Sequence, residues 1–239
     1  MTTDAITVSD LVVHRGKVRA LRALSCGVRA GRVTGLLGPS GSGKTTLIRA
    51  IVGVQVVRSG TVTVLGEPAG SRALRDKIGY VSQSPSIYQD LTVLENARYF
   101  AAIAGVGAAA ARQAVRDVGL ASAADQLVGN LSGGQRSRAS LACAIVGDPP
   151  VLVLDEPTVG QDPVLREELW DAFRQRALAG ATVLVSSHVM DEANRCDSLM
   201  LIRDGALLAD DTPAAIKRHA GTDDMDRAFL QLIRQGASS

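Results

Sequence analysis

The sequence predicts an α/β fold in which a mostly parallel sheet carries helices on both faces. Short apolar segments alternate with longer segments whose apolar residues recur at the period of a helix, and this alternation is typical of a parallel sheet. Hydrophobic residues make up 46% of the 239-residue chain, whereas aromatic residues make up only 3%. The composition therefore indicates one globular domain, spanning 1–239, with a mainly aliphatic core.

The N-terminal third of the chain is rich in predicted strands. They are short apolar or alternating segments bounded by glycine, proline or polar turns. The expected strands are 6–13, 21–28, 32–37, 61–64 and 78–82. A polar turn at 14–17 separates the first two, and a helix over 46–52 follows the third.

From about residue 84 to residue 144 the pattern becomes helical. Alanine and leucine dominate there, and helices are expected over 92–104 and 108–118. We interpret 84–144 as an inserted helical subdomain. Strand patterns return after it; the expected strands are 151–154, 182–186 and 199–202, with helices over 165–179 and 189–195.

The segment 211–239 is expected to be a short tail with one helix, over 223–234. Met225, Phe229, Leu232 and Ile233 share one face of that helix. This apolar face indicates packing against the domain, with binding to a partner as the alternative.

A phosphate-binding loop is predicted at 38–45, where GPSGSGKT fits the pattern G-x-x-x-x-G-K-[ST] between a strand and a helix. Glycines let backbone N–H groups approach an anion, and the helix start adds its positive end. Lys44 offers a point charge to the β- and γ-phosphates, and the Thr45 hydroxyl can bind Mg²⁺. The alternative, an ordinary glycine-serine turn, is disfavoured by the strand-loop-helix context. The expected nucleotide-binding residues are Gly38, Pro39, Ser40, Gly41, Ser42, Gly43, Lys44, Thr45 and Thr46.

Two adjacent acids, Asp155 and Glu156, follow the predicted strand 151–154. A carboxylate at the end of such a strand can hold Mg²⁺ through water, and a second one can polarise an attacking water. We expect Asp155 to take the first role and Glu156 the second. A solvated strand end is the alternative, and it weakens once a phosphate loop is present.

A second helix N-terminus suited to phosphate is predicted at Leu131-Ser132-Gly133-Gly134-Gln135, where Ser132 occupies an N-cap position. The helical insertion separates this helix start from the phosphate loop, so the two sites need not bind the same nucleotide within one subunit. In a dimer, the helix start of each subunit could instead cover the nucleotide in the phosphate loop of the other, which explains why the chain has both sites. A capped helix without a ligand is the alternative.

In these motifs the chain closely resembles the ATP-binding subunits of ABC transporters. Five elements occur in the family's order: the loop 38–46, Gln83, LSGGQ at 131–135, VLVLDEP at 151–157 and His188 in SSHVMDEA. A phosphate loop is common to many families, whereas LSGGQ followed by DEP is nearly diagnostic of this one. The resemblance covers about residues 5–235. It implies a P-loop NTPase (RecA-like) core with a mostly parallel sheet, an N-terminal antiparallel β portion and an inserted α-helical subdomain.

The resemblance also implies roles for single residues. Glu156 would be the general base, and His188 would contact the γ-phosphate and position Glu156. Gln83 would touch Mg²⁺ and water while linking the core to the helical insertion. With these roles, the expected catalytic residues are Glu156, His188, Lys44 and Gln83, and the expected metal ligands are Thr45, Gln83 and Asp155.

Two positions depart from the family's pattern. Gln161 stands where the family usually has leucine, just before Asp162, which would bridge the two subunits. The family also has an adenine-stacking aromatic residue before the glycine of its first turn, and Arg15 occupies that place here. An arginine plane can stack on a base, with the ring of His14 as the alternative. In a third interpretation Arg15 is solvated and apolar contacts elsewhere hold the adenine. Since neither arginine nor histidine matches the uncharged face of an aromatic residue such as tyrosine, the contact with the base is expected to be weak. A weak contact with the base predicts that GTP is hydrolysed nearly as well as ATP.

The family's mechanism implies an ATPase that binds two ATP with Mg²⁺ between head-to-tail subunits of a homodimer and drives a membrane-spanning permease. No stretch of this chain approaches ~18 uncharged apolar residues, so the permease is expected to be a separate polypeptide. The start of the chain lacks the basic and apolar regions of a signal peptide, and three cysteines without a CxxC pair suit a reducing compartment. We therefore expect the chain at the cytoplasmic face of the cell membrane.

Segments 80–96, 157–170 and 186–199 resemble the branch that exports drugs, antibiotics and polysaccharides or lipids. The alternatives are the ATPase of an importer, a soluble ABC ATPase that acts on ribosomes or DNA, and a regulatory subunit without turnover. The net charge of only +2, without a basic stripe, argues against nucleic acid as a partner. Glu156 and His188 together argue against a subunit that lacks turnover.

Overall fold

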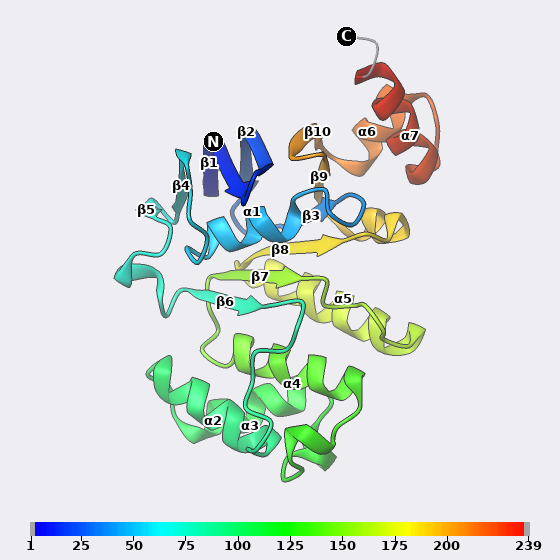
Figure 1. Cartoon of the computed structure of the whole chain (residues 1–239). Coiled ribbons are helices and arrows are strands. Elements are labelled where there is room, and N and C mark those ends of the chain that lie inside the picture. The colour runs from blue at the N-terminus through cyan, green and yellow to red at the C-terminus, as the bar shows by residue number, and fades with distance from the viewer. Residues whose placement is uncertain (1–2, 237–239) are drawn as a thin grey trace.

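The computed structural model describes residues 3–236, in which two sheets lie around helix α1 and a group of helices forms the opposite end (Figure 1). The first sheet has the strand order β2-β1-β4-β5, and all its pairs are antiparallel. Its strands are β1 (Asp4–Arg15), β2 (Val18–Arg29), β4 (Ser59–Val64) and β5 (Glu67–Pro68). This sheet confirms the expected N-terminal antiparallel portion.

The second sheet has the order β10-β9-β3-β8-β7-β6, and only the β9–β10 pair is antiparallel. Its strands are β3 (Val33–Leu37), β6 (Ile78–Val81), β7 (Val151–Asp155), β8 (Thr182–Ser187), β9 (Ser198–Arg203) and β10 (Ala206–Asp211). Every residue of β3, β7 and β8 is buried, which explains their continuous apolar runs. Because parallel strands end at the same edge, the segments that follow β3, β6, β7 and β8 lie close together.

Seven α-helices are present among the described residues: α1 (Lys44–Ile51), α2 (Val93–Ile103), α3 (Ala108–Asp117), α4 (Gly133–Ile145), α5 (Pro163–Leu178), α6 (Pro213–Ala220) and α7 (Met225–Gly236). Four 3₁₀ segments complete the set: η1 (Arg72–Leu74), η2 (Ala121–Ala123), η3 (Val128–Asn130) and η4 (Met190–Arg195). Helices α2, α3 and α4 lie between β6 and β7 in the chain and form the expected helical insert. A capping box fixes the start of α2, since Thr92 Oγ1 accepts the N–H of Glu95 and the Glu95 carboxylate accepts the N–H of Thr92.

The core has two parts, one on each side of the second sheet. On one side Leu47, Ile48 and Ile51 of α1 pack with the first sheet and with Val151 and Val153 of β7. The other side is covered by α5, the helical insert and the C-terminal helices. The sheet is therefore buried on both faces, as its strand sequences predict.

The tail differs from the expectation of one helix. Residues 213–220 form α6 as well, which is only eight residues long and too short for its periodicity to stand out. Its start is fixed by Thr212, whose hydroxyl accepts the N–H of Ala215 at 3.2 Å, and it ends at Gly221 with φ 67°. In α7, Met225, Phe229 and Leu232 are buried, which confirms a packing helix.

Other differences concern the ends and types of elements. Strand β1 ends at Arg15 and strand β2 begins at Val18, so the turn between them has two residues, 16 and 17, instead of the expected 14–17. The helix expected over 189–195 is the 3₁₀ segment η4, and β10 was not predicted. Alternation within β10 is weak, because most of its residues are only half-buried.

Candidate functional site

The loop 38–43 joins β3 to α1 and is held in shape by its neighbours. A Cβ at Gly38 would lie 2.1 Å from the carbonyl oxygen of Ile202, so no larger residue fits there. Gly43 has φ 113° and is the N-cap residue of α1. The N–H of Gly205, in the turn before β10, donates to Ser42 O at 2.9 Å. The loop is therefore preformed, with the N-terminus of α1 opening onto it.

Lys44 lies at the centre of this loop and is only 4% exposed. Its Nζ donates to Gly38 O at 2.7 Å and to Pro39 O at 3.1 Å, and lies 3.7 Å from Glu156 Oε1. Burial lowers the pKa of Lys44, while the carboxylates of Glu156 and Asp155 oppose that shift. A positive charge in this place attracts an anion that enters the loop.

The Glu156 carboxylate is the point at which the predicted catalytic residues meet. Gln83, after β6, donates from Nε2 to Glu156 Oε2 at 3.2 Å. His188, after β8, has its Nδ1 3.4 Å from Glu156 Oε1, and Lys44 approaches the same oxygen. Glu156 itself has φ 54°, an unusual backbone angle for a residue with a side chain. Residues far apart in the sequence thus surround one carboxylate at the edge of the sheet.

One carboxylate oxygen of Asp155 lacks a hydrogen-bond partner among the described residues. Ser186 donates its hydroxyl to Asp155 Oδ1 at 2.7 Å and accepts the N–H of Glu156 at 2.9 Å. Asp155 Oδ2 is buried and makes no hydrogen bond within residues 3–236. A divalent cation would satisfy such an oxygen. The same part of the chain has no group of three His, Cys, Asp or Glu residues that could hold a metal ion.

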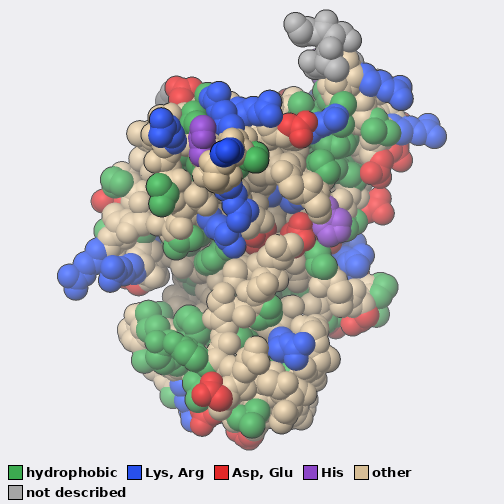
Figure 2. Space-filling view, in the orientation of Figure 1, with side chains coloured by type: hydrophobic (Ala, Val, Ile, Leu, Met, Phe, Trp, Pro, Cys, Tyr) green, Lys and Arg blue, Asp and Glu red, His purple; other side chains and the backbone are tan. Residues whose placement is uncertain are grey.

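A cleft of about 580 Å³ runs from the loop to the turn between β1 and β2. Arg15 lines it, whereas His14 is not among the lining residues. Three further arginines line the same cleft, Arg19, Arg22 and Arg49. Basic side chains accordingly gather over the first sheet and α1 on the face shown in Figure 2. The cleft suits a polyanion.

Several residues that surround the cleft or Glu156 lie outside the predicted motifs. Ser186 directly follows the apolar residues 183–185 and lies two residues before His188. That position is the only feature of the sequence that could have indicated a role for Ser186 in the site. Arg49 lies on α1, and Asp204 in the turn before β10; both line the cleft. Neither belongs to a motif, because only the fold brings these segments beside the loop.

The signature segment lies apart from the cleft in the same subunit. Ser132 caps α4 through a capping box: its hydroxyl accepts the N–H of Gln135 at 3.2 Å, and Gln135 Oε1 accepts the N–H of Ser132 at 2.9 Å. Leu131 is buried, whereas Gly133 and Gly134 form the first turn of the helix. The cleft is lined by none of the residues 131–135. Within one chain, the two predicted phosphate sites are not brought together.

Asp162 begins α5, where its Oδ1 accepts the N–H of Leu165 at 3.0 Å. Pro163 occupies the first helical position, which favours a helix start here. One carboxylate oxygen of Asp162 is therefore engaged within its own subunit, and the other is left for further contacts.

No helix within residues 3–236 is long and apolar enough to cross a bilayer. The three cysteines, Cys26, Cys143 and Cys196, are free thiols. Burial raises the pKa of each of these thiols to about 12, which favours the protonated form at neutral pH.

Comparison with known proteins agrees with this site. The family model described as ABC transporter matches residues 21–159, which is more than half of the chain. The chain is 41% identical to Nod factor export ATP-binding protein I of Burkholderia orbicola (strain AU 1054), over 90% of this chain and 73% of that protein. It is 40% identical to the probable multidrug ABC transporter ATP-binding protein YbhF of Escherichia coli (strain K12), over 82% of this chain and 35% of that protein.

The fold is likewise that of a solved ATP-binding subunit of an ABC transporter. The two structures superpose with a TM-score of 0.88 at 26% sequence identity, over 96% of this chain and 99% of the other. Motifs, fold and relatives agree on ATP as the nucleotide of this cassette. The chain belongs to the ABC transporter family, and it is an ATP-binding subunit with ATPase activity.

Proposed function

We propose that this chain hydrolyses ATP with Mg²⁺ as one half of a head-to-tail homodimer, and that the dimer drives a separate permease that exports its substrate. The convergence of Lys44, Gln83 and His188 on the Glu156 carboxylate carries the catalytic part of this proposal. The carboxylate lies beside a preformed phosphate loop, where a water could be aligned with a γ-phosphate.

The loop residues 38–46 bind the phosphates of ATP, and Lys44 moves from its own loop carbonyls to the β- and γ-phosphates. Thr45, Gln83 and Asp155 would hold Mg²⁺, and the buried Oδ2 of Asp155, which lacks a hydrogen-bond partner among the described residues, supports this assignment. Mg²⁺, when bound, supplies charge neutralisation on the phosphates.

Glu156 acts as the general base. One of its Oε atoms takes a proton from the water that attacks the γ-phosphorus, while the bond to the β–γ bridging oxygen breaks. Gln83 orients the carboxylate through its 3.2 Å hydrogen bond, and His188 contacts the γ-phosphate while holding the other oxygen. Ser186 fixes the backbone of Glu156, which keeps the base at one position.

The signature segment of each subunit binds the nucleotide of the other. Within one chain, residues 131–135 lie outside the cleft, although the capped start of α4 offers free N–H groups to a phosphate. Asp162, at the start of α5, takes part in the subunit contact. ATP binding closes this pair, and hydrolysis reopens it.

Ser132→Arg tests the trans arrangement. The arginine would block dimer closure by bulk, yet leave ATP binding to the isolated monomer unchanged, since Ser132 does not line the cleft. We expect an unaltered dissociation constant for ATP and loss of ATP-dependent dimers in size-exclusion chromatography. Ser122→Arg, an exposed change in the same helical insert, is the matched control. Loss of nucleotide binding by the Ser132→Arg monomer would contradict the trans model.

Arg15 contacts the base end of the nucleotide, because it lines the cleft at the end of β1. Arg15→Tyr should tighten ATP binding by up to ~1–2 kcal/mol, the scale of one aromatic stacking contact on a base. We also expect the native chain to hydrolyse GTP nearly as well as ATP. Equilibrium binding of both nucleotides to the native chain and the variant measures this. A strong native preference for ATP, unchanged by the substitution, would refute the role of Arg15.

Export is the direction supported by the relatives. The proteins that resemble this chain at about 40% identity are named for Nod factor export and for probable multidrug transport. The importer ATPase remains the second candidate, on the grounds that the ATPase site is common to both directions.

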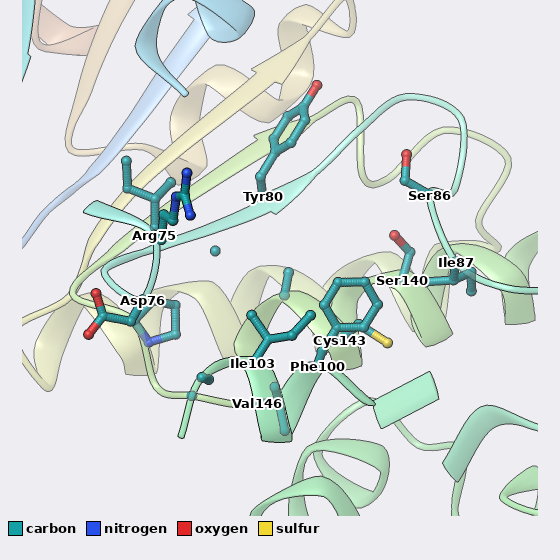
Figure 3. A pocket seen from close by; sticks show the side chains of 16 residues that line it. Arg75, Asp76, Tyr80, Ser86, Ile87, Phe100, Ile103, Ser140, Cys143 and Val146 are labelled. Carbon is teal, nitrogen blue, oxygen red and sulfur yellow. The ribbon is translucent and has the colours of Figure 1, made fainter. Parts of the chain in front are cut away.

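A groove beside the helical insert provides a docking place for the permease, and Figure 3 shows its lining. Phe100 and Ile103 of α2 line this cavity of about 300 Å³ together with Cys143 of α4. Arg75 and Asp76 lie at one end of it (Figure 3). Ile103 is 58% exposed, and hydrophobic side chains gather on the helical insert in Figure 2. An apolar groove with a charged end suits a short amphipathic segment of a membrane protein.

Ile103→Glu tests this docking and with it the transport function. The charge should lower recovery of the chain in the membrane fraction of cells that express its permease, while ATPase activity of the purified chain stays unchanged. Leu178→Glu is the matched control, since Leu178 is 75% exposed on α5, away from the groove. Recovery should also require the permease gene. Unchanged membrane recovery after deletion of that gene would count against a transport subunit and favour a soluble ATPase.

A further inference from the structure

Gln161, in the loop between β7 and α5, has a buried side chain without hydrogen bonds. The residue is 6% exposed, and among the described residues neither Oε1 nor Nε2 has a hydrogen-bond partner. A buried amide without partners destabilises the folded subunit, whereas an apolar side chain of the same size would not. Gln161 is therefore unfavourable for the stability of the free subunit.

The amide of Gln161 lies against the signature segment of its own subunit. A Cβ added at Gly134 would lie 2.9 Å from Gln161 Oε1, so the amide packs directly against this glycine. Gly134 belongs to the first turn of α4, whose N-terminus is proposed to bind the nucleotide of the other subunit. Gln161 thus contacts the helix start at which the two subunits would meet.

The backbone of Gln161 connects this contact to the segment that follows His188. Its N–H donates to Thr158 O at 3.2 Å, and its carbonyl accepts from Arg166 Nη2 at 3.4 Å. Arg166 Nε lies 3.9 Å from Glu192 Oε1, and the indole N–H of Trp170 donates to the same oxygen at 3.3 Å. These contacts link Gln161 through Arg166 and Glu192 to Trp170, the single tryptophan of the chain.

We propose that Gln161 is a positioning residue that favours the closed, ATP-bound dimer, because closure supplies the hydrogen-bond partners that its amide lacks in the free subunit. The proposal rests on the dimer of the proposed function. The Nε2 donors and the Oε1 acceptor suit the polar groups that closure brings to the start of α4, phosphate oxygens and backbone N–H groups. Because the unpaired amide destabilises only the open form, it shifts the equilibrium toward the closed one.

The test is Gln161→Met in a chain that also carries Glu156→Gln, so that ATP is bound but not consumed. Methionine keeps the length of the side chain and removes both hydrogen-bonding atoms. The unfolding temperature without nucleotide should rise. The dissociation constant of the ATP-dependent dimer, measured by sedimentation, should increase roughly 5- to 150-fold, the usual span of a coupling between two sites. The protein concentration at which half of the ATP-induced change in Trp170 fluorescence occurs should rise by the same factor.

Gln175→Met is the control, since Gln175 is exposed on α5 and should leave all three measurements unchanged. Gln161→Leu serves as a second apolar variant if the methionine chain does not fold. An unfolding temperature that fails to rise in either apolar variant, or a dimer as tight as that of the control, would overturn the role of Gln161. Absence of ATP-dependent dimers in the chain with native Gln161 would instead overturn the proposed dimer itself, and the role of Gln161 with it.

Discussion

Glu156→Gln should reduce ATP turnover by about 10²- to 10⁴-fold, the usual contribution of a positioned general base, while ATP binding persists. The amide has the shape of the carboxylate and can still accept the hydrogen bond from Gln83, but it cannot take a proton from water. In the proposed mechanism hydrolysis reopens the dimer, so we expect an ATP-bound dimer to accumulate. Phosphate release and light scattering after size-exclusion chromatography measure the two effects.

Glu168→Gln is the matched control for this change, because Glu168 is exposed on α5 and does not line the cleft. Its turnover should equal that of the native chain. Near-normal turnover in Glu156→Gln would remove Glu156 from the role of base, and the convergence of Gln83 and His188 on it would need another explanation.

Lys44→Ala should weaken ATP binding itself, by about 10- to 150-fold, because hydrogen bonds to charged groups contribute ~1.5–3 kcal/mol each. The variant fails at an earlier step than Glu156→Gln, so it should form no ATP-dependent dimer at nucleotide concentrations that saturate the native chain. Titration calorimetry with ATP gives the dissociation constant directly.

Lys77→Ala removes an exposed lysine and should leave ATP affinity unchanged. Because Lys44 is buried, its variant also requires a measured unfolding temperature, which separates lost binding from lost folding. An ATP affinity equal to that of the control would show that the charge of Lys44 does not hold the phosphates.

Most of the fold could be predicted because its elements carry local signals. The alternation of apolar strands and periodic helices identified the parallel sheet, and capping residues such as Ser132 marked helix starts. The additional helix α6 was missed because eight residues with a proline start give too little periodicity. Strand β10 was missed because its half-buried residues do not alternate clearly.

The motifs of the site could be read from the sequence because each is a short segment with its own backbone geometry. Glycines, Lys44 and Thr45 at fixed spacing describe a loop between a strand and a helix. By contrast, no pattern in the sequence indicated that Ser186 bridges Asp155 and the backbone of Glu156.

By itself, the sequence determined the family, the order of most elements and the phosphate loop, because local backbone conformation and spacing encode them, and it predicted Glu156 as the base. Only the tertiary structure decided that Lys44 and Gln83 join His188 at the Glu156 carboxylate, which arginines line the cleft, and that the amide of Gln161 is buried against Gly134. These contacts join segments far apart in the chain, and their distances depend on how the two sheets, α1 and the helical insert pack together. Packing of that kind is a property of the whole core and leaves no signal in any single segment.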